Sequence, residues 1–184
     1  MACGITALNS NSGCALVQGG ILYTYAVKRS DISSITFTSG LITAMTLGVG
    51  AGFVKLEYDI DNTALFEQPP TRNNNIITHA QRAFVKFKGL FTAAGRAWAQ
   101  AAQECCDLVL IHRMATGEAV VQGVEESSVA AAGFTGTQSL ATRFVGNMTT
   151  DVGGGENRLE GEFQGVAYSY APLTDLTDSE IEAL

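Results

Sequence analysis

The sequence predicts a mainly-β (α+β) domain: an antiparallel β-sandwich or barrel with one flanking α-helix, an extended loop and extended termini. Three observations predict this fold class. Short runs rich in β-branched and aromatic residues recur along the chain, separated by turn residues. One good stretch, at about 89–105, has apolar residues at helical spacing. Strands and helices do not alternate as they do in a βαβ fold, so a parallel sheet is not expected.

The predicted strands of the first half follow one another closely. A strand is expected at 21–27, and strands at 32–38 and 41–47 form a hairpin. Between 53 and 60, apolar and charged residues alternate strictly, which predicts a strand with one buried face. The buried face carries Val54, Leu56, Tyr58 and Ile60, and the other face carries Lys55, Glu57 and Asp59.

A loop of about fifteen residues is expected at 61–75, where two prolines and three asparagines occur. A loop of this length in a small domain often has a function of its own. A strand follows at 76–88, and its end leads into the predicted helix at about 89–105. That helix is rich in alanine, so another surface can approach it closely. Trp98 on this helix is either a core residue or an anchor at a subunit interface.

The second half returns to strands. A hairpin is expected with strands at 108–112 and 119–124, and two further strands at 141–150 and 157–170 flank a run of three glycines. In the last strand Glu160, Glu162 and Gln164 alternate onto one face, which we interpret as a solvated acidic face.

The chain divides into three parts. Residues 1–19 are small and polar and are predicted to form an N-terminal arm. Residues 20–172 are predicted to form a single β-sandwich domain with the helix at about 89–105. Residues 173–184 are predicted to be an acidic C-terminal tail, with a short helix where Thr177 and Glu180 have the spacing of a capping box.

Composition restricts the classes of function. The chain has 184 residues and a net charge of −7, which argues against a nucleic-acid binder because phosphate binding needs a concentrated basic patch. The start lacks a basic secretory leader, and the longest weakly polar run, 40–54, is shorter than the ~20 residues of a membrane span. No membrane partner is therefore expected.

The motifs that suggest chemistry each have a simpler interpretation. The glycine-rich run 48–52 is followed by a strand, whereas a dinucleotide site needs a helix there. His112 near Cys105 and Cys106 lacks the ligand spacing of a zinc site and the neighbours of a thiol nucleophile, so we interpret it as a strand-edge histidine. We interpret the four cysteines as reduced, and a bridge between Cys3 and Cys14 stays open. No catalytic residue, metal ligand or cofactor is predicted.

Several segments, in their order along the chain, resemble the tail tube (major tail) proteins of tailed bacteriophages. These segments are a strand at 20–27 after a small-residue arm, Phe84–Gly89 before the helix, Asp107–Gly123 as strand-turn-strand ending in Val-Val-Gln-Gly, Phe134-Thr135-Gly136-Thr137, and 157–172 with Phe163-Gln164-Gly165 and a tyrosine-rich end. The resemblance covers residues 18 to 172 and rests on this order, because no single motif is diagnostic.

The resemblance implies a virion protein, assembled in the host cytoplasm, whose subunits form stacked hexameric rings. Strands would line a channel through which DNA passes without specific binding, and other tail proteins would be partners. Candidate residues from the sequence fall into three groups. Acidic residues expected to face the channel are Glu57 and Asp59, or Glu160 and Glu162; the expected subunit-interface helix presents Leu90, Ala94, Trp98 and Ala101; and the expected inter-ring loop presents Phe66, Pro69, Pro70 and Asn74.

Other functions stay open at this point. The cysteines of the N-terminal arm are not typical of tube proteins, which leaves a head–tail joining or capsid-cementing protein as an alternative. A non-catalytic module that binds a ligand with loops 61–75 and 127–136 is a second alternative. A small hydrolase is the third, although no base or oxyanion donor is placed near a nucleophile.

Overall fold

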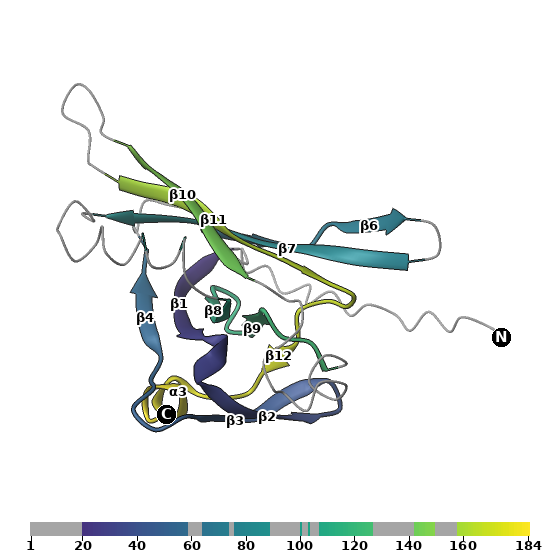
Figure 1. Ribbon diagram of the computed structural model, residues 1–184, viewed down its shortest axis with the longest axis vertical. Coiled ribbons are helices and arrows are strands. Elements are labelled where there is room, and N and C mark those ends of the chain that lie inside the picture. The colour runs from purple at the N-terminus through teal and green to yellow at the C-terminus, as the bar shows by residue number, and fades with distance from the viewer. Residues whose placement is uncertain are drawn as a thin grey trace, which may run out of the picture.

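Two β-sheets, packed face to face, make up the protein (Figure 1). The computed structural model describes residues 20–58, 64–73, 76–88, 100, 103, 107–126, 142–149 and 158–184. Its strands are β1 (Ile21–Lys28), β2 (Ile32–Thr38), β3 (Leu41–Leu47), β4 (Val54–Glu57), β5 (Leu65–Glu67), β6 (Pro70–Asn73), β7 (Ile76–Lys88), β8 (Leu108–Met114), β9 (Ala119–Gln122), β10 (Arg143–Thr149), β11 (Arg158–Ala167) and β12 (Leu173–Thr174). A 3-10 turn, η1 (Arg29–Asp31), follows β1, and a short helix, α3 (Asp178–Glu182), lies near the C-terminus. The predicted mainly-β class is confirmed.

The strands pair in two separate orders. Sheet A has seven strands in the order β2-β3-β12-β9-β8-β1-β4, and every pair is antiparallel except β12 with β3. Sheet B has the order β10-β11-β7-β5, and β6 also pairs with β7. All pairs in sheet B are antiparallel.

One hydrophobic core fills the space between the sheets. Because side chains alternate between the two faces of a strand, every second residue of the central strands faces this core. Sheet A contributes Ile21, Ala26, Leu56 and Leu110, and sheet B contributes Ala83, Val85, Phe144 and Phe163. The rings of Phe144 and Phe163 are 5.0 Å apart between centroids.

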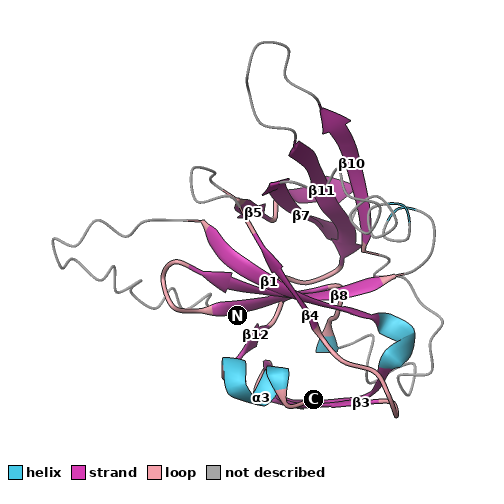
Figure 2. Cartoon of the chain, turned by 90° about the vertical axis from the view of Figure 1, so that its left-hand side faces the viewer, coloured by secondary structure: helices cyan, strands magenta, loops and turns pink. Residues whose placement is uncertain are grey.

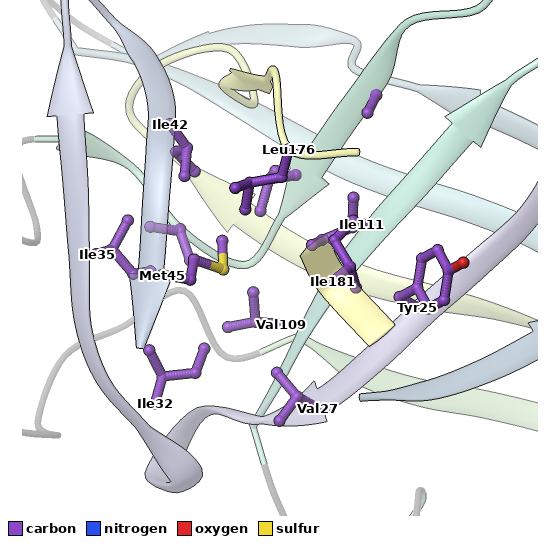
Figure 3. Packing of buried hydrophobic residues seen from close by; sticks show 13 residues of the cluster. Tyr25, Val27, Ile32, Ile35, Ile42, Met45, Val109, Ile111, Leu176 and Ile181 are labelled. Carbon is purple, nitrogen blue, oxygen red and sulfur yellow. The ribbon is translucent and has the colours of Figure 1, made fainter. Parts of the chain in front are cut away.

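A second core lies on the other face of sheet A. Figure 2 shows β1, β8 and β4 between sheet B on one side and α3 with β3 on the other. The cluster includes Tyr25, Val27, Ile35 and Ile42 from the strands and Ile181 from α3 (Figure 3). Sheet A is therefore buried on both faces along its central strands.

The C-terminal segment is part of sheet A, so the predicted acidic tail at 173–184 is wrong. β12 lies between β3 and β9, and it is the strand through which the hairpin β2–β3 joins the rest of the sheet. Leu176 and Ile181 are buried, and the predicted capping box at the start of α3 is confirmed. The sequence suggests a tail because the segment is short and acidic, whereas its pairing partners are distant in the chain.

Arg113 of β8 holds this segment by polar contacts. Its Nε donates to Asp178 Oδ1 at 2.7 Å, and its Nη2 donates to the carbonyl oxygen of Leu176. The hydroxyl of Tyr23 also donates to Asp178, and that of Tyr25 donates to Glu182 at 2.8 Å. We call residues 173–184 with these contacts the C-terminal clasp.

Most predicted strands are confirmed, including both hairpins and the two long strands β7 and β11. The loop predicted at 61–75 is wrong in part, because β5 and β6 lie within it and pair with β7. Val54 is 53% exposed although it was predicted on the buried face of its strand, since β4 is an edge strand of sheet A. Of the predicted helix at 89–105, the structure describes Gln100 and Gln103, and both are helical.

Candidate functional site

The outer face of sheet B, the face that points away from sheet A, is open to solvent. Alternation along β7, β10 and β11 sends one set of side chains into the core and the other set outwards. The outward set includes Leu65 and Glu67 from β5, Arg82, Phe84 and Lys86 from β7, Arg143 and Val145 from β10, and Glu160, Glu162, Gln164 and Val166 from β11. Four of these residues are exposed apolar side chains: Leu65, Phe84, Val145 and Val166.

Charges of both signs share this face. Glu160 lies 3.4 Å from Lys86, and Glu67 lies 3.9 Å from Arg82, measured between oxygen and nitrogen. The predicted alternation of Glu160, Glu162 and Gln164 onto one face is confirmed by the register of β11 with β7, in which the buried Phe163 and Gly165 face the other way. The face predicted to be acidic at Glu160 and Glu162 also carries cations of β7 and β10, which lie among the carboxylates.

Two open depressions lie along the same face. One, of about 350 Å³, is lined by Phe84, Lys86, Val145, Glu160 and Glu162. The other, of about 470 Å³, is lined by Arg82, Arg143, Val145, Gln164 and Val166. Both are broad and mixed in polarity, which suits contact with an extended surface better than enclosure of a small molecule.

The hairpin β6–β7 projects beyond the body of the protein. In Figure 1 the ribbon of β6 and the start of β7 extends past sheet A. Ile76 and Ile77, at the outer end of β7, are 58% and 50% exposed. A two-stranded ribbon is marginally stable in water by itself, and apolar groups at its tip gain free energy from contact with another surface.

The two predicted acidic pairs lie on different sheets. Glu57 is exposed on β4 of sheet A, opposite Tyr23, whose hydroxyl contacts α3. Glu160 and Glu162 are on the outer face of sheet B. The structure therefore does not bring these acidic groups to one surface, and Asp59 lies outside the described residues.

The residues predicted for the inter-ring loop have separate environments. Phe66 points inwards from β5, packs on the inter-sheet core and lies 5.1 Å from the ring of His112, so it is not a loop residue. Pro69 is exposed between β5 and β6, and Pro70 begins β6. Asn74 lies outside the described residues.

Other sequence candidates cannot be placed. The predicted interface helix presents Leu90, Ala94, Trp98 and Ala101, which all lie outside the described residues, as do the four cysteines and the loop 127–136. The sequence reasoning missed Ile76, Ile77 and Val145 as exposed apolar residues. The sequence did contain a signal for Ile76 and Ile77, because side chains alternate along a strand and two adjacent isoleucines cannot both face one core.

No group of three His, Cys, Asp or Glu side chains that could hold a metal ion occurs within the described ranges. Among the described residues, no helix is long and apolar enough to cross a membrane. Comparison with known proteins finds no matching family model, no matching curated protein and no matching solved structure.

Proposed function

We propose that this chain is a virion structural protein that self-assembles into stacked rings and forms the tube of a phage tail. The observation that carries the proposal is the projecting hairpin β6–β7, which carries the exposed apolar side chains of Ile76 and Ile77 near its outer end. The order of segments that resembles tail tube proteins supports the same function, and hexameric rings are the assembly that this resemblance implies.

The projecting hairpin favours assembly with further copies of the chain. Such a tip on one subunit would contact a different surface on the next subunit, because the tip is a protrusion and its partner surface must receive it. A contact of this heterologous kind repeats from copy to copy, and it produces closed rings or open stacks.

We assign the outer face of sheet B to the conduit for DNA. The face combines carboxylates with cations, and two of the cations lie within 4.0 Å of a carboxylate in an ion pair. Paired cations attract phosphates weakly, so DNA would pass over this face without binding firmly. The proposal includes other tail proteins as partners and assembly in the host cytoplasm.

Negative-stain imaging of the purified chain tests the assembly. We expect rings or tubes from the wild type and single subunits from the double variant Ile76→Lys/Ile77→Lys. Leu22→Lys/Val54→Lys is the matched control, since these residues are 57% and 53% exposed but lie in sheet A. Assembly that survives the hairpin variant as well as the control variant would refute the role of the hairpin, and a wild type that stays monomeric would refute the proposal.

A further inference from the structure

A line of buried polar side chains joins the two sheets. Thr24 of β1, His112 of β8 and Gln122 of β9 are each 0% exposed. The prediction of a strand-edge histidine is wrong, because β8 lies between β9 and β1 inside sheet A. Burial of three polar groups in an apolar core is costly unless their hydrogen bonds are satisfied, so the bonds along this line decide its stability.

The amide of Gln122 fixes the protonation of His112. Its Nε2 donates to the carbonyl oxygens of Gln81 in β7 and Phe163 in β11, both at 3.0 Å. Its Oε1 must then accept from His112 Nε2, which lies 2.9 Å away. The neutral ring therefore carries its proton on Nε2 and has an acceptor at Nδ1. These bonds link sheet A to the backbone of sheet B.

The other side of the ring completes the line. Thr24 Oγ1 lies 2.8 Å from His112 Nδ1 and donates its hydrogen to that nitrogen. Tyr58, which follows β4, donates in turn to Thr24 Oγ1 at 2.5 Å. Each hydroxyl and ring hydrogen on this line has one acceptor, and the assignment holds only while His112 is neutral.

We propose that His112 makes the contact between the two sheets an acid-sensitive lock, closed while the ring is neutral and opened when the ring is protonated. A second ring hydrogen on Nδ1 would face Thr24 Oγ1, which already accepts from Tyr58 and whose own hydrogen would lose its acceptor. The imidazolium would also be buried in an apolar core. Both effects raise the free energy of the folded state alone, because water solvates the charged ring in the unfolded chain.

Among the described residues, the groups that contact the His112 ring do not compensate such a charge. Thr24 contacts the ring from β1, Gln122 from β9 and Phe66 from β5, and none of the three is charged. Tyr58 is the titratable group at the near end, and burial raises its pKa, so it stays a neutral phenol.

Charged side chains lie beyond the far end of the line. Arg29 Nη1 donates to the carbonyl oxygen of Gly123 at 3.3 Å, next to Gln122. Glu125 is buried and accepts from the backbone N–H groups of Tyr168 and Ser169. Burial lowers the pKa of His112 from 6.5 to about 4, although its hydrogen bond to Gln122 acts in the opposite direction.

The sign of the pH dependence follows from this lowered pKa. Below pH 6.5 the unfolded chain binds a proton that the folded chain does not bind until about pH 4. Above pH 6.5 the buried neutral ring of His112 therefore costs no stability. As the pH falls from 6.5 to about 4, the free energy of unfolding decreases, because only the unfolded chain binds the proton. At about pH 5, protonation of His112 is expected to raise the unfolding equilibrium constant roughly 30-fold.

Urea unfolding of the full chain at about pH 7.5 and about pH 5 tests the lock. Wild type and His79→Gln, which alters the other histidine, should both show the roughly 30-fold contribution, and His112→Gln should lack it. An equal acid response in all three proteins would overturn the proposal, because other groups would then carry the response.

The protonation of His112 can also be measured directly in the wild type, without a substitution that could itself change the fold. Nitrogen-15 NMR of the His112 ring is expected to show a neutral ring protonated on Nε2 at about pH 5.5. A ring that is already charged at that pH, or one protonated on Nδ1, would contradict the assigned line of hydrogen bonds. The inference is independent of the tube proposal, since it concerns contacts within one subunit.

Discussion

At the scale of single residues, two glycines make room for a core aromatic ring. Gly146 of β10 and Gly161 of β11 are paired directly, and Phe144 lies against them. A Cβ atom added to Gly146 would be 2.3 Å from the Phe144 ring, and one added to Gly161 would be 2.5 Å from the carbonyl oxygen of Val145. Side chains cannot occupy these positions unless the backbone or the ring moves.

Gly161→Ala is therefore expected to lower the free energy of unfolding by about 3 kcal/mol through overpacking. Gly52→Ala is the matched control, because its added Cβ would have no atom within 4 Å. Urea unfolding of both variants measures the difference. Equal effects would show that the space beside Phe144 is not restricted.

A carboxylate of the C-terminal clasp gives a second residue-scale prediction. Burial alone would raise the pKa of Asp178, but hydrogen bonds from Tyr23 and Arg113 outweigh burial and hold the pKa below its usual 3.8. A depressed carboxylate pKa stabilises the fold above the unfolded pKa, and this contribution disappears as the pH falls through the folded pKa. The pH range over which Asp178 affects stability lies below the range for His112, so the effects of the two groups on stability can be measured separately.

Asp178→Asn should lower stability by about 1 kcal/mol near neutral pH, since the pair with Arg113 is partly exposed. It should also reduce the loss of stability below pH 3.8. Asp175→Asn, an exposed carboxylate on the same segment, serves as the control. Acid titration of the unfolding free energy distinguishes the variants, and an unchanged acid response in Asp178→Asn would rule out the clasp carboxylate as its source.

At the scale of elements, the C-terminal clasp connects the hairpin β2–β3 to the rest of sheet A. Thr174 Oγ1 donates to the carbonyl oxygen of Ile42 at 2.8 Å, and the backbone N–H of Val121 donates to the carbonyl oxygen of Pro172 at 2.8 Å. The hairpin pairs with sheet A only through β12 in the described part of the chain. Its order should therefore depend on α3, which packs in the second core.

Ile181→Ala is expected to cost about 3 kcal/mol, because it leaves a cavity in the second core. Amide hydrogen exchange should then become faster in β2 and β3 before it becomes faster in β7 and β11. Leu173→Ala deletes the same number of carbon atoms at a position that is 40% exposed and should have little effect. Uniform acceleration across both sheets would contradict a special dependence of the hairpin on the clasp.

The sequence predicts those elements whose pattern is local. β2 with β3, and β8 with β9, are hairpins between neighbouring runs, so alternation and turn residues suffice to find them. β12 could not be found in this way, because two residues pair with strands more than fifty positions away. The buried position of His112 was also hidden, since it depends on contacts from Gln122 and sheet B.

The candidate site also combines features that depend on local sequence pattern with features that depend on pairing between distant strands. The shared face of Glu160 and Glu162 could be read from their spacing, whereas Lys86 and Arg82 join that face only through the pairing of β7 with β11 and β5. The projecting tip at Ile76 depends on β6, which begins at a proline that weakens the strand signal.

At the scale of the whole molecule, the proposal that DNA passes over the sheet B face without firm binding depends on the mixed charge of that face. Glu160→Lys/Glu162→Lys would remove two carboxylates from among the cations and should make the chain bind double-stranded DNA at low salt. The control Glu57→Lys/Glu118→Lys makes the same change in net charge at exposed positions outside sheet B. Fluorescence polarisation with labelled DNA measures the difference, and equal binding by both variants would assign the effect to net charge alone.

Assembly is the central claim, and sedimentation velocity of the full wild-type chain from micromolar to millimolar concentration tests it most directly. If exposed Ile76 and Ile77 bind a second copy, the sedimentation coefficient should rise with concentration towards a ring and then towards larger stacks. The Ile76→Lys/Ile77→Lys variant should remain at the monomer value. A wild type that sediments as a monomer across the whole range would contradict the account.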